Sequence, residues 1–121
     1  MVKIFRPRYM YIKIVAEDKN ILNDISSHEI LNLIRKSMHN LFGEYILAKS
    51  PIQVMDFDPE NATVILRTTH KALPYVRCSI LFITNIKGVK AAFHTLHVSG
   101  TIKKLKAKIR ARDEKINQLP N

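Results

Sequence analysis

Seven basic side chains gather between positions 103 and 115 of this 121-residue sequence, and their chemistry suits phosphate groups. They are Lys103, Lys104, Lys106, Lys108, Arg110, Arg112 and Lys115, interrupted by only two acidic residues, Asp113 and Glu114. The whole chain has a formal net charge of +10. A solvated helix surface is the usual fate of a charge run, but seven bases against two acids are too unbalanced to pair with one another. Because basic proteins gain affinity by releasing the counterions of polyphosphates, the pattern favours RNA as the partner.

Two further basic groups, Arg67 and His70, are expected where a strand ends and a helix begins. A strand-end arginine beside helix amides can hold a phosphate with two hydrogen bonds. Arg67 can equally pair with Glu44 or Asp56, and the sequence does not decide between these interpretations. Arg8 belongs to a second basic cluster near the start of the chain.

Other residue types capable of chemistry have simpler explanations. His94 and His97 stand three apart on a predicted strand, so they should point to opposite faces and form a poor metal site. The alternating acids Asp56, Asp58 and Glu60 suit a hairpin turn better than a Mg²⁺ site. Cys78 is expected to be a buried structural thiol, and the three glycines form no phosphate-binding loop. We therefore expect no catalytic residue, no metal site and no cofactor bound by the protein itself.

The elements that must position these residues can be read along the chain. Residues 8–17 alternate as a strand; a capping box at Ser26 and Glu29 begins a helix that Gly43 should end. Its apolar stripe consists of Ile30, Ile34, Met38 and Leu41. A second strand within 44–60, bent near Pro51, and a third at 62–69 flank a turn. A second helix is expected from Leu73 or Pro74 to Ile83, with a stop at Gly88. A strand at 89–98 and then a basic helix at about 101–119 complete the order.

This order predicts one α+β domain over residues 1–121: a ferredoxin-like (RRM-like) sandwich, with a four-stranded antiparallel sheet and an added C-terminal helix. Two helices should cover one face of the sheet. The other face is expected to present Tyr9, Tyr11, Lys13, Ile65, Arg67, Phe93, Thr95 and His97. Since this face is too apolar to be bare, a cover by the last helix or by a protein partner is favoured over base stacking on its aromatic rings.

The last helix also carries a narrow apolar seam for docking. Its members are Ile102, Leu105, Ile109, Ile116 and Leu119, with Arg112 at the missing step. The helix has no Trp or Phe to anchor it in a membrane surface. With a single cysteine, no signal peptide and no long apolar stretch, the chain is expected to be soluble and cytoplasmic, with no membrane partner.

Three segments resemble the ribonuclease P protein component 2 family, the archaeal counterpart of a eukaryotic subunit shared by ribonucleases P and MRP. They are RPRYMYIKIV near the start, LFGEYILAKSPIQVMDFDPENATVILRTTH in the middle and FHTLHVSGTIKKLKAKI near the end. The string from His94 to Lys103 is the most specific of these, and the resemblance covers nearly the whole chain in order.

The resemblance implies a non-catalytic subunit of ribonuclease P, the endonuclease (a hydrolase) that removes the 5′ leader from precursor tRNA. It implies catalysis by the RNA subunit, with Mg²⁺ held chiefly by that RNA. The implied partners are ribonuclease P RNA, precursor tRNA, the barrel protein called ribonuclease P protein component 3 and other ribonuclease P proteins, with a homodimer as an alternative to a monomer. The RNA-binding residues that it implies are Arg8, Arg67, His70, Lys103 and Lys104, while Lys106, Lys108 and Arg110 come from the charge argument alone.

Two other functions remain as alternatives. One is a small autonomous enzyme on the same fold, acting on a phosphate ester through Arg67. The other is a protein-interaction scaffold whose basic helix docks an acidic partner.

Overall fold

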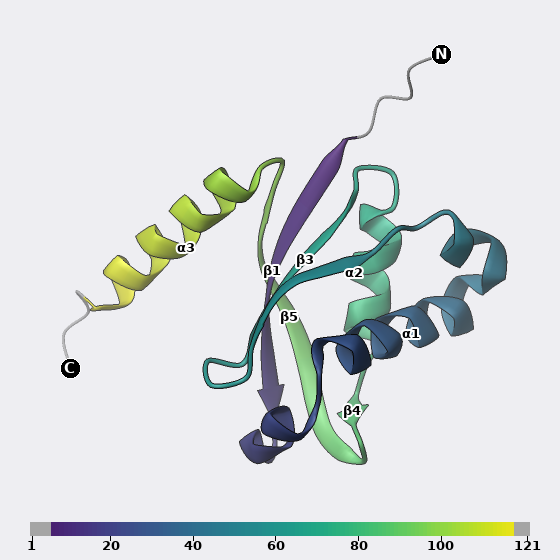
Figure 1. The fold of residues 1–121 in the computed structure, drawn as a ribbon, viewed down its shortest axis with the longest axis horizontal. Coiled ribbons are helices and arrows are strands. Elements are labelled where there is room, and N and C mark those ends of the chain that lie inside the picture. Colours follow the sequence, from purple (N-terminus) through teal and green to yellow (C-terminus); the bar gives the residue numbers. More distant parts are fainter. Residues whose placement is uncertain (1–5, 118–121) are drawn as a thin grey trace.

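A curled antiparallel sheet separates two helices on one side from a third helix on the other (Figure 1). The computed structural model describes residues 6–117. The elements are β1 (Pro7–Ala16), the 3-10 helix η1 (Lys19–Asp24), α1 (Ser27–Ala48), β2 (Gln53–Asp58), β3 (Thr63–Thr69), α2 (Leu73–Leu81), β4 (Asn85–Ile86), β5 (Val89–Ser99) and α3 (Ile102–Asn117). The predicted α+β class, antiparallel sheet and C-terminal helix are confirmed.

The prediction of four strands was wrong, because the sheet has five in the order β2-β3-β1-β5-β4. The additional strand, β4, has two residues and pairs with the start of β5. Lys87 and Gly88 join them with φ angles of 49° and 84°, the positive values of a two-residue hairpin turn. Gly88 was expected to end a helix, but it serves this turn instead.

Helix α1 begins as its sequence predicts and then breaks. The Ser26 hydroxyl accepts a hydrogen bond from the Glu29 backbone N–H at 3.2 Å. Gly43 interrupts the helix with φ 84° and ψ 178°, a conformation open in practice only to glycine. Residues 44–48, which were expected to be extended, form a further helical segment after the break, so the second strand begins only at Gln53.

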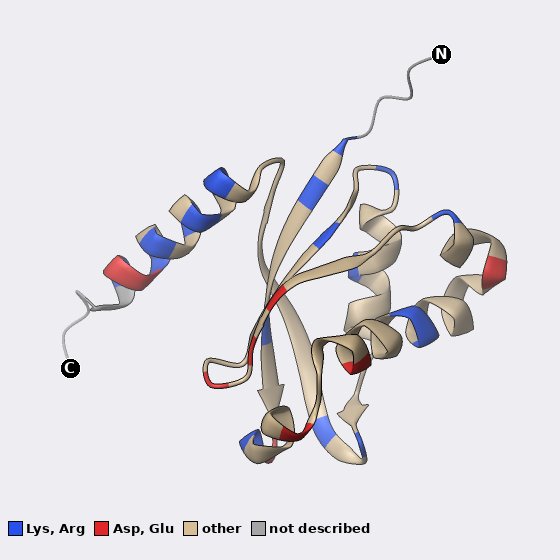
Figure 2. Cartoon of the chain, in the orientation of Figure 1, with Lys and Arg blue, Asp and Glu red and all other residues tan. Residues whose placement is uncertain are grey.

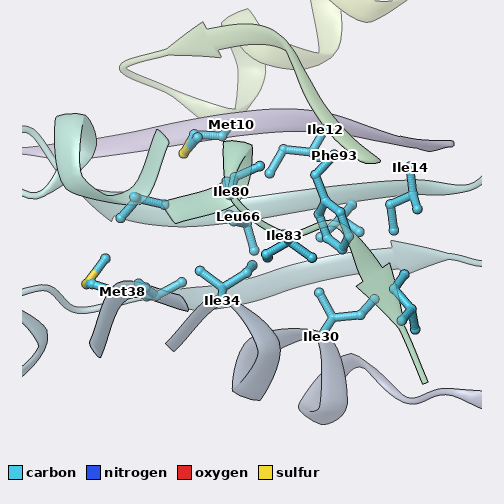
Figure 3. Packing of buried hydrophobic residues seen from close by; sticks show 14 of the residues in the cluster. Met10, Ile12, Ile14, Ile30, Ile34, Met38, Leu66, Ile80, Ile83 and Phe93 are labelled. Atoms are coloured by element: carbon cyan, nitrogen blue, oxygen red, sulfur yellow. The ribbon is translucent and has the colours of Figure 1, made fainter. Parts of the chain in front are cut away.

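The main core lies between the sheet and the two helices α1 and α2 (Figure 3). Helix α1 contributes side chains spaced four residues apart, which places them on one face of the helix. The labelled members of this core are Met10, Ile12 and Ile14 from β1, Ile30, Ile34 and Met38 from α1, Leu66 from β3, Ile80 from α2, Ile83 after α2, and Phe93 from β5. Leu41, expected in the same stripe, is 39% exposed instead.

A bulge in β5 changes which of its side chains face the core. Ile12 of β1 pairs with Thr95 and Tyr11 pairs with His97, so the pairing skips Leu96. Phe93 is consequently in the core, beside Ile14. The expectation that Phe93 and Thr95 face outward was therefore wrong.

The same bulge corrects the placement of two histidines. His94 pairs with Lys13 and His97 with Tyr11, and both partners alternate to the outer face of β1. His94 and His97 thus share the outer face of the sheet, although a regular strand would have placed them on opposite faces.

Helix α3 covers part of the outer face, as predicted. Leu105 is 0% exposed and lies outside the main core, while Ile102 and Ile109 are half-buried. The helix contacts β5 and β1, and the Lys108 ammonium donates a hydrogen bond to the Val98 carbonyl at 3.0 Å. Leu119 and the side chain of Ile116 lie outside what the structure describes. Among the described helices, none has the length and apolar character needed to span a membrane.

Candidate nucleic-acid interface

Basic side chains gather at the end of the sheet where β1 begins and where β3 and β5 end (Figure 2). Tyr9 of β1 lies between Arg67 of β3 and Ser99 of β5, and β5 then leads directly into α3. The backbone N–H of His70 donates to the Arg6 carbonyl at 2.7 Å, which joins the end of β3 to the start of β1. We call this group of residues the basic end; it comprises Arg6, Arg8, Arg67, His70, Lys71, Lys103 and Lys104.

Arg67 is half-buried on the outer face, beside an aromatic ring. Its guanidinium carbon lies 5.9 Å from the centre of the Tyr9 ring, within the range of a cation–π contact. Such a contact fixes the orientation of the planar guanidinium, whose positive charge persists at any physiological pH. His70 comes directly after the last residue of β3 and is exposed.

Arg8 lies at the same end but alternates to the opposite face of β1 from Tyr9 and Arg67, since it pairs with Thr68. Its Nη1 donates to the Pro7 carbonyl at 2.8 Å. The same nitrogen lies close to Gly100, where it would be 3.6 Å from a Cβ atom. The guanidinium of Arg8 therefore sits beside the turn that begins α3.

The basic residues of α3 differ in their position along and around the helix. Lys103 and Lys104 are exposed in the first turn, where the Thr101 hydroxyl accepts a hydrogen bond from the Lys104 backbone N–H at 3.1 Å. Lys108 leans toward the sheet through its bond to Val98. Lys106 and Arg110 are exposed further along the helix, so they extend the positive surface away from the basic end.

Beneath α3, His97 and Tyr11 form a stacked pair with ring centres 6.2 Å apart. Burial lowers the pKa of His97, and the nearby cations Arg112 and Lys108 lower it further. Its Nε2 atom is enclosed and has no hydrogen-bond partner within residues 6–117. Burial also raises the pKa of Tyr11, with Asp113 acting in the same direction. These two rings are half-buried on the face of the sheet against which α3 packs.

Asp58 at the end of β2 serves the β2–β3 turn, as predicted, whereas Asp56 lies within β2 and pairs with Ile65. The Asp58 carboxylate accepts hydrogen bonds from the side-chain amide of Asn61 at 2.6 Å and from the backbone N–H of Glu60 at 3.1 Å. These bonds, with that of the Asn61 side chain the strongest, lower the pKa of Asp58. The turn lies at the opposite end of the sheet from the basic end (Figure 2).

Within residues 6–117, no three His, Cys, Asp or Glu side chains are placed to hold a metal ion. Cys78 is half-buried on α2 rather than fully enclosed.

Strand pairing thus brings Arg67 and His70 to the start of α3 with its Lys103 and Lys104. It also adds two residues that the predicted RNA-binding set did not include, Arg6 and Lys71. Their charge was visible in the sequence, but their proximity depends on the register of three strands.

Known proteins are similar to this chain along most of its length. Residues 8–110 match the model of the Rpp14/Pop5 family. Ribonuclease P protein component 2 of Archaeoglobus fulgidus is 35% identical over 103 residues, covering 85% of this chain and 87% of that protein. The same component of Pyrococcus horikoshii is 31% identical over 105 residues, covering 87% of this chain and 83% of the relative.

A solved structure shares the fold. One chain in a cryo-EM structure of yeast ribonuclease MRP superimposes with a TM-score of 0.66 at 13% identity, covering 98% of this chain and all of that one. The family resemblance found in the sequence is thereby confirmed: the chain belongs to the Rpp14/Pop5 family, which includes the archaeal ribonuclease P protein component 2.

Proposed function

We propose that this protein is a non-catalytic subunit of ribonuclease P that binds the RNA subunit and organises its catalytic domain. The observation that carries the proposal is the basic end, where the start of β1, the end of β3 and the first turn of α3 present cations together. Cations spaced along such a surface neutralise adjacent RNA phosphates, which lets folded RNA segments approach one another. Contacts of this kind position RNA without reading its sequence.

The way α3 is held supports the same function. Leu105 is enclosed against the outer face of the sheet, and Lys108 is bonded to β5. The exposed lysines of the first turn therefore have a defined direction relative to Arg67 and Arg8. In this proposal, α3 must dock on the sheet before its lysines are correctly positioned to bind RNA.

The proposal assigns hydrolysis of the 5′ leader of precursor tRNA, and the Mg²⁺ that it requires, to the RNA subunit. Its expected partners are ribonuclease P RNA, precursor tRNA, ribonuclease P protein component 3 and other ribonuclease P proteins, with a homodimer as an alternative assembly. A cytoplasmic location belongs to the proposal. So does the ferredoxin-like interpretation of the fold, which the element order β1, α1, β2, β3, α2, β5 supports.

Salt-dependent binding to ribonuclease P RNA tests the proposal. Replacing Lys103 and Lys104 together by Glu should weaken binding by at least about tenfold and reduce the slope of log affinity against log salt by about two. The matched control replaces Lys19 and Lys90, exposed lysines at the opposite end of the sheet, by Glu. Equal losses in both double variants, or binding that does not fall with rising salt, would contradict a specific role for the basic end.

A further inference from the structure

Most of the large apolar side chains that remain exposed within residues 6–117 belong to α1, to α2 or to Phe82, which directly follows α2. Their exposed fractions are large for residues of this type: Leu41 39%, Tyr45 67%, Tyr75 36%, Leu81 70% and Phe82 62%. We call these five residues the helix-layer patch. Large apolar side chains clustered on a surface commonly mark a protein interface.

Direct contacts between the two helices make the patch continuous. The rings of Phe42 and Tyr75 meet edge to face with centres 5.0 Å apart. The Ser37 hydroxyl of α1 donates to the Ser79 carbonyl of α2 at 2.7 Å. Leu41 and Phe82 line the same shallow hollow between the helices. These contacts link Leu41, Tyr75 and Phe82 across the two packed helices, which also carry Tyr45 and Leu81.

The residues around the patch are mainly cationic. Lys36 lines the hollow next to Leu41 and Phe82, and Arg77 is one helical turn before Leu81. The Lys49 ammonium lies 4.4 Å from the centre of the Tyr45 ring. Glu44 is the acidic residue of this rim. A partner surface with apolar groups at its centre and carboxylates around them would complement this patch in both hydrophobicity and charge.

We propose that the helix-layer patch docks a folded protein whose contact surface is apolar at its centre and acidic at its edge. A second copy of this chain would bring two cationic rims together, which opposes symmetric association through the patch. RNA would find exposed aliphatic side chains such as Leu41 and Leu81 in place of hydrogen-bonding groups.

Helices α1 and α2, which carry most of the patch, lie on the opposite side of the sheet from α3 (Figure 1). A protein on the helix layer and RNA at the basic end are thus bound on separate surfaces, so one molecule joins the two. This inference rests on the proposed function in one respect: the protein used to test it is ribonuclease P protein component 3, the partner named there.

Association of the purified chain with component 3, measured by calorimetry and by sedimentation velocity, tests the docking surface. Replacing Leu81 and Phe82 together by Ser should weaken the association by at least about tenfold, and Tyr45→Ser by about threefold or more. These side chains are largely exposed, so their replacement leaves the core intact. Val15→Ser is the matched control, because Val15 is 54% exposed on the outer face of the sheet, away from the patch. Replacing Lys36 and Arg77 by Glu should weaken binding and reverse its salt dependence.

The other outcomes show whether the docking surface alone fails or the proposed partner fails with it. Component 3 binding that is unchanged in the Leu81/Phe82 variant overturns the docking surface and leaves RNA binding at the basic end untouched. The docking surface is also overturned if this variant instead loses RNA affinity or self-association, since RNA or a second copy would then occupy the patch. Failure of the unaltered protein to bind component 3 overturns both the proposed partner and this surface.

Discussion

His97 shows how a single side chain can report on the docking of a helix. It lies on the outer face beside Tyr11, under α3, with Lys108 and Arg112 as neighbouring cations and Asp113 near the Tyr11 ring. Protonation would place one more positive charge in this enclosed space. The lowered pKa of His97 is the consequence of both burial and these cations.

The stability of the protein should therefore fall in acid, partly through His97. In the unfolded chain the imidazole titrates near its ordinary pKa of 6.5, so below that pH the unfolded state binds the proton first. The contribution of neutral His97 is fully present above pH 6.5 and is lost as the pH falls toward the lower pKa of the folded state. Urea midpoints measured at about pH 7.5 and about pH 5.5 should differ less in His97→Phe than in the unaltered protein.

His94 provides the control for this measurement, because it is exposed on the same strand and the same face. His94→Gln should retain the pH dependence of the unaltered chain. If His97→Phe and the unaltered chain show the same change between the two pH values, His97 is not the group responsible.

At the scale of elements, the docking of α3 depends on Leu105, the one enclosed side chain among residues 102–115 of this helix. Leu105 is 0% exposed against the outer face of the sheet, while its seam neighbours Ile102 and Ile109 are half-buried. Leu105→Ala removes buried apolar surface at a cost of about 2–5 kcal/mol, concentrated on the docking of α3.

Hydrogen exchange should locate this loss. In Leu105→Ala, the amides of α3 should exchange faster while those of β1 and β3 keep their protection. RNA affinity should fall although every lysine is still present. Val15→Ala, an apolar truncation on the exposed part of the same face, should change neither quantity. If the amides of α3 exchange rapidly in Leu105→Ala but the RNA affinity is unchanged, then docking of α3 on the sheet is not needed to position its lysines for RNA binding.

Helix α1 depends on a glycine at its break. Gly43 has φ 84° and ψ 178°, and a residue that carries a Cβ atom is destabilised by about 1–3 kcal/mol in this region. Gly43→Ala should lower the free energy of unfolding by about that amount, as measured by urea titration. Gly100→Ala is the control, since Gly100 has no positive φ and a Cβ there would meet only Arg8 Nη1 at 3.6 Å. Equal effects of both changes would show that the conformation of Gly43 carries no special cost.

Local patterns in the sequence predicted the elements whose cause is local. The Ser26 cap, the four-residue spacing of Ile30, Ile34 and Met38 and the alternation of β1 all agree with the structure. The bulge at Leu96 was not predictable from alternation, because it arises from pairing with β1. The residues after Gly43 were mistaken for a strand because a helix that restarts after a glycine break has the same apolar content as a buried strand.

In the candidate site too, the features with a local cause were predictable from the sequence and those that depend on strand pairing were not. The basic run of α3 and its apolar seam were evident from spacing, and Leu105 confirms the docking side. The proximity of Arg67, His70 and Arg6 depends on strand register and was not visible in any local pattern. The exposure of Leu41 was also missed, since helical spacing alone does not show where a helix leaves the core.

At the scale of the whole molecule, two surfaces are separated by the sheet. The basic end and α3 lie at one end and on the outer face of the sheet, and the helix-layer patch lies on the other side (Figures 1 and 2). Acidic residues of the β2–β3 turn lie at the far end of the sheet from the basic end, so positive and negative charge are separated along the strands. This distribution suits the proposed role in RNA binding.

Reconstituted cleavage of precursor tRNA at low Mg²⁺ tests this role most directly. Ribonuclease P RNA would be assayed alone, with this protein, and with this protein together with component 3. We expect the pair to raise the rate at low Mg²⁺ by at least about tenfold, the Lys103/Lys104 double Glu variant to lose most of that gain, and the protein without RNA to cleave nothing. Cleavage by the purified protein without RNA, or no gain on adding the pair, would contradict the proposed role.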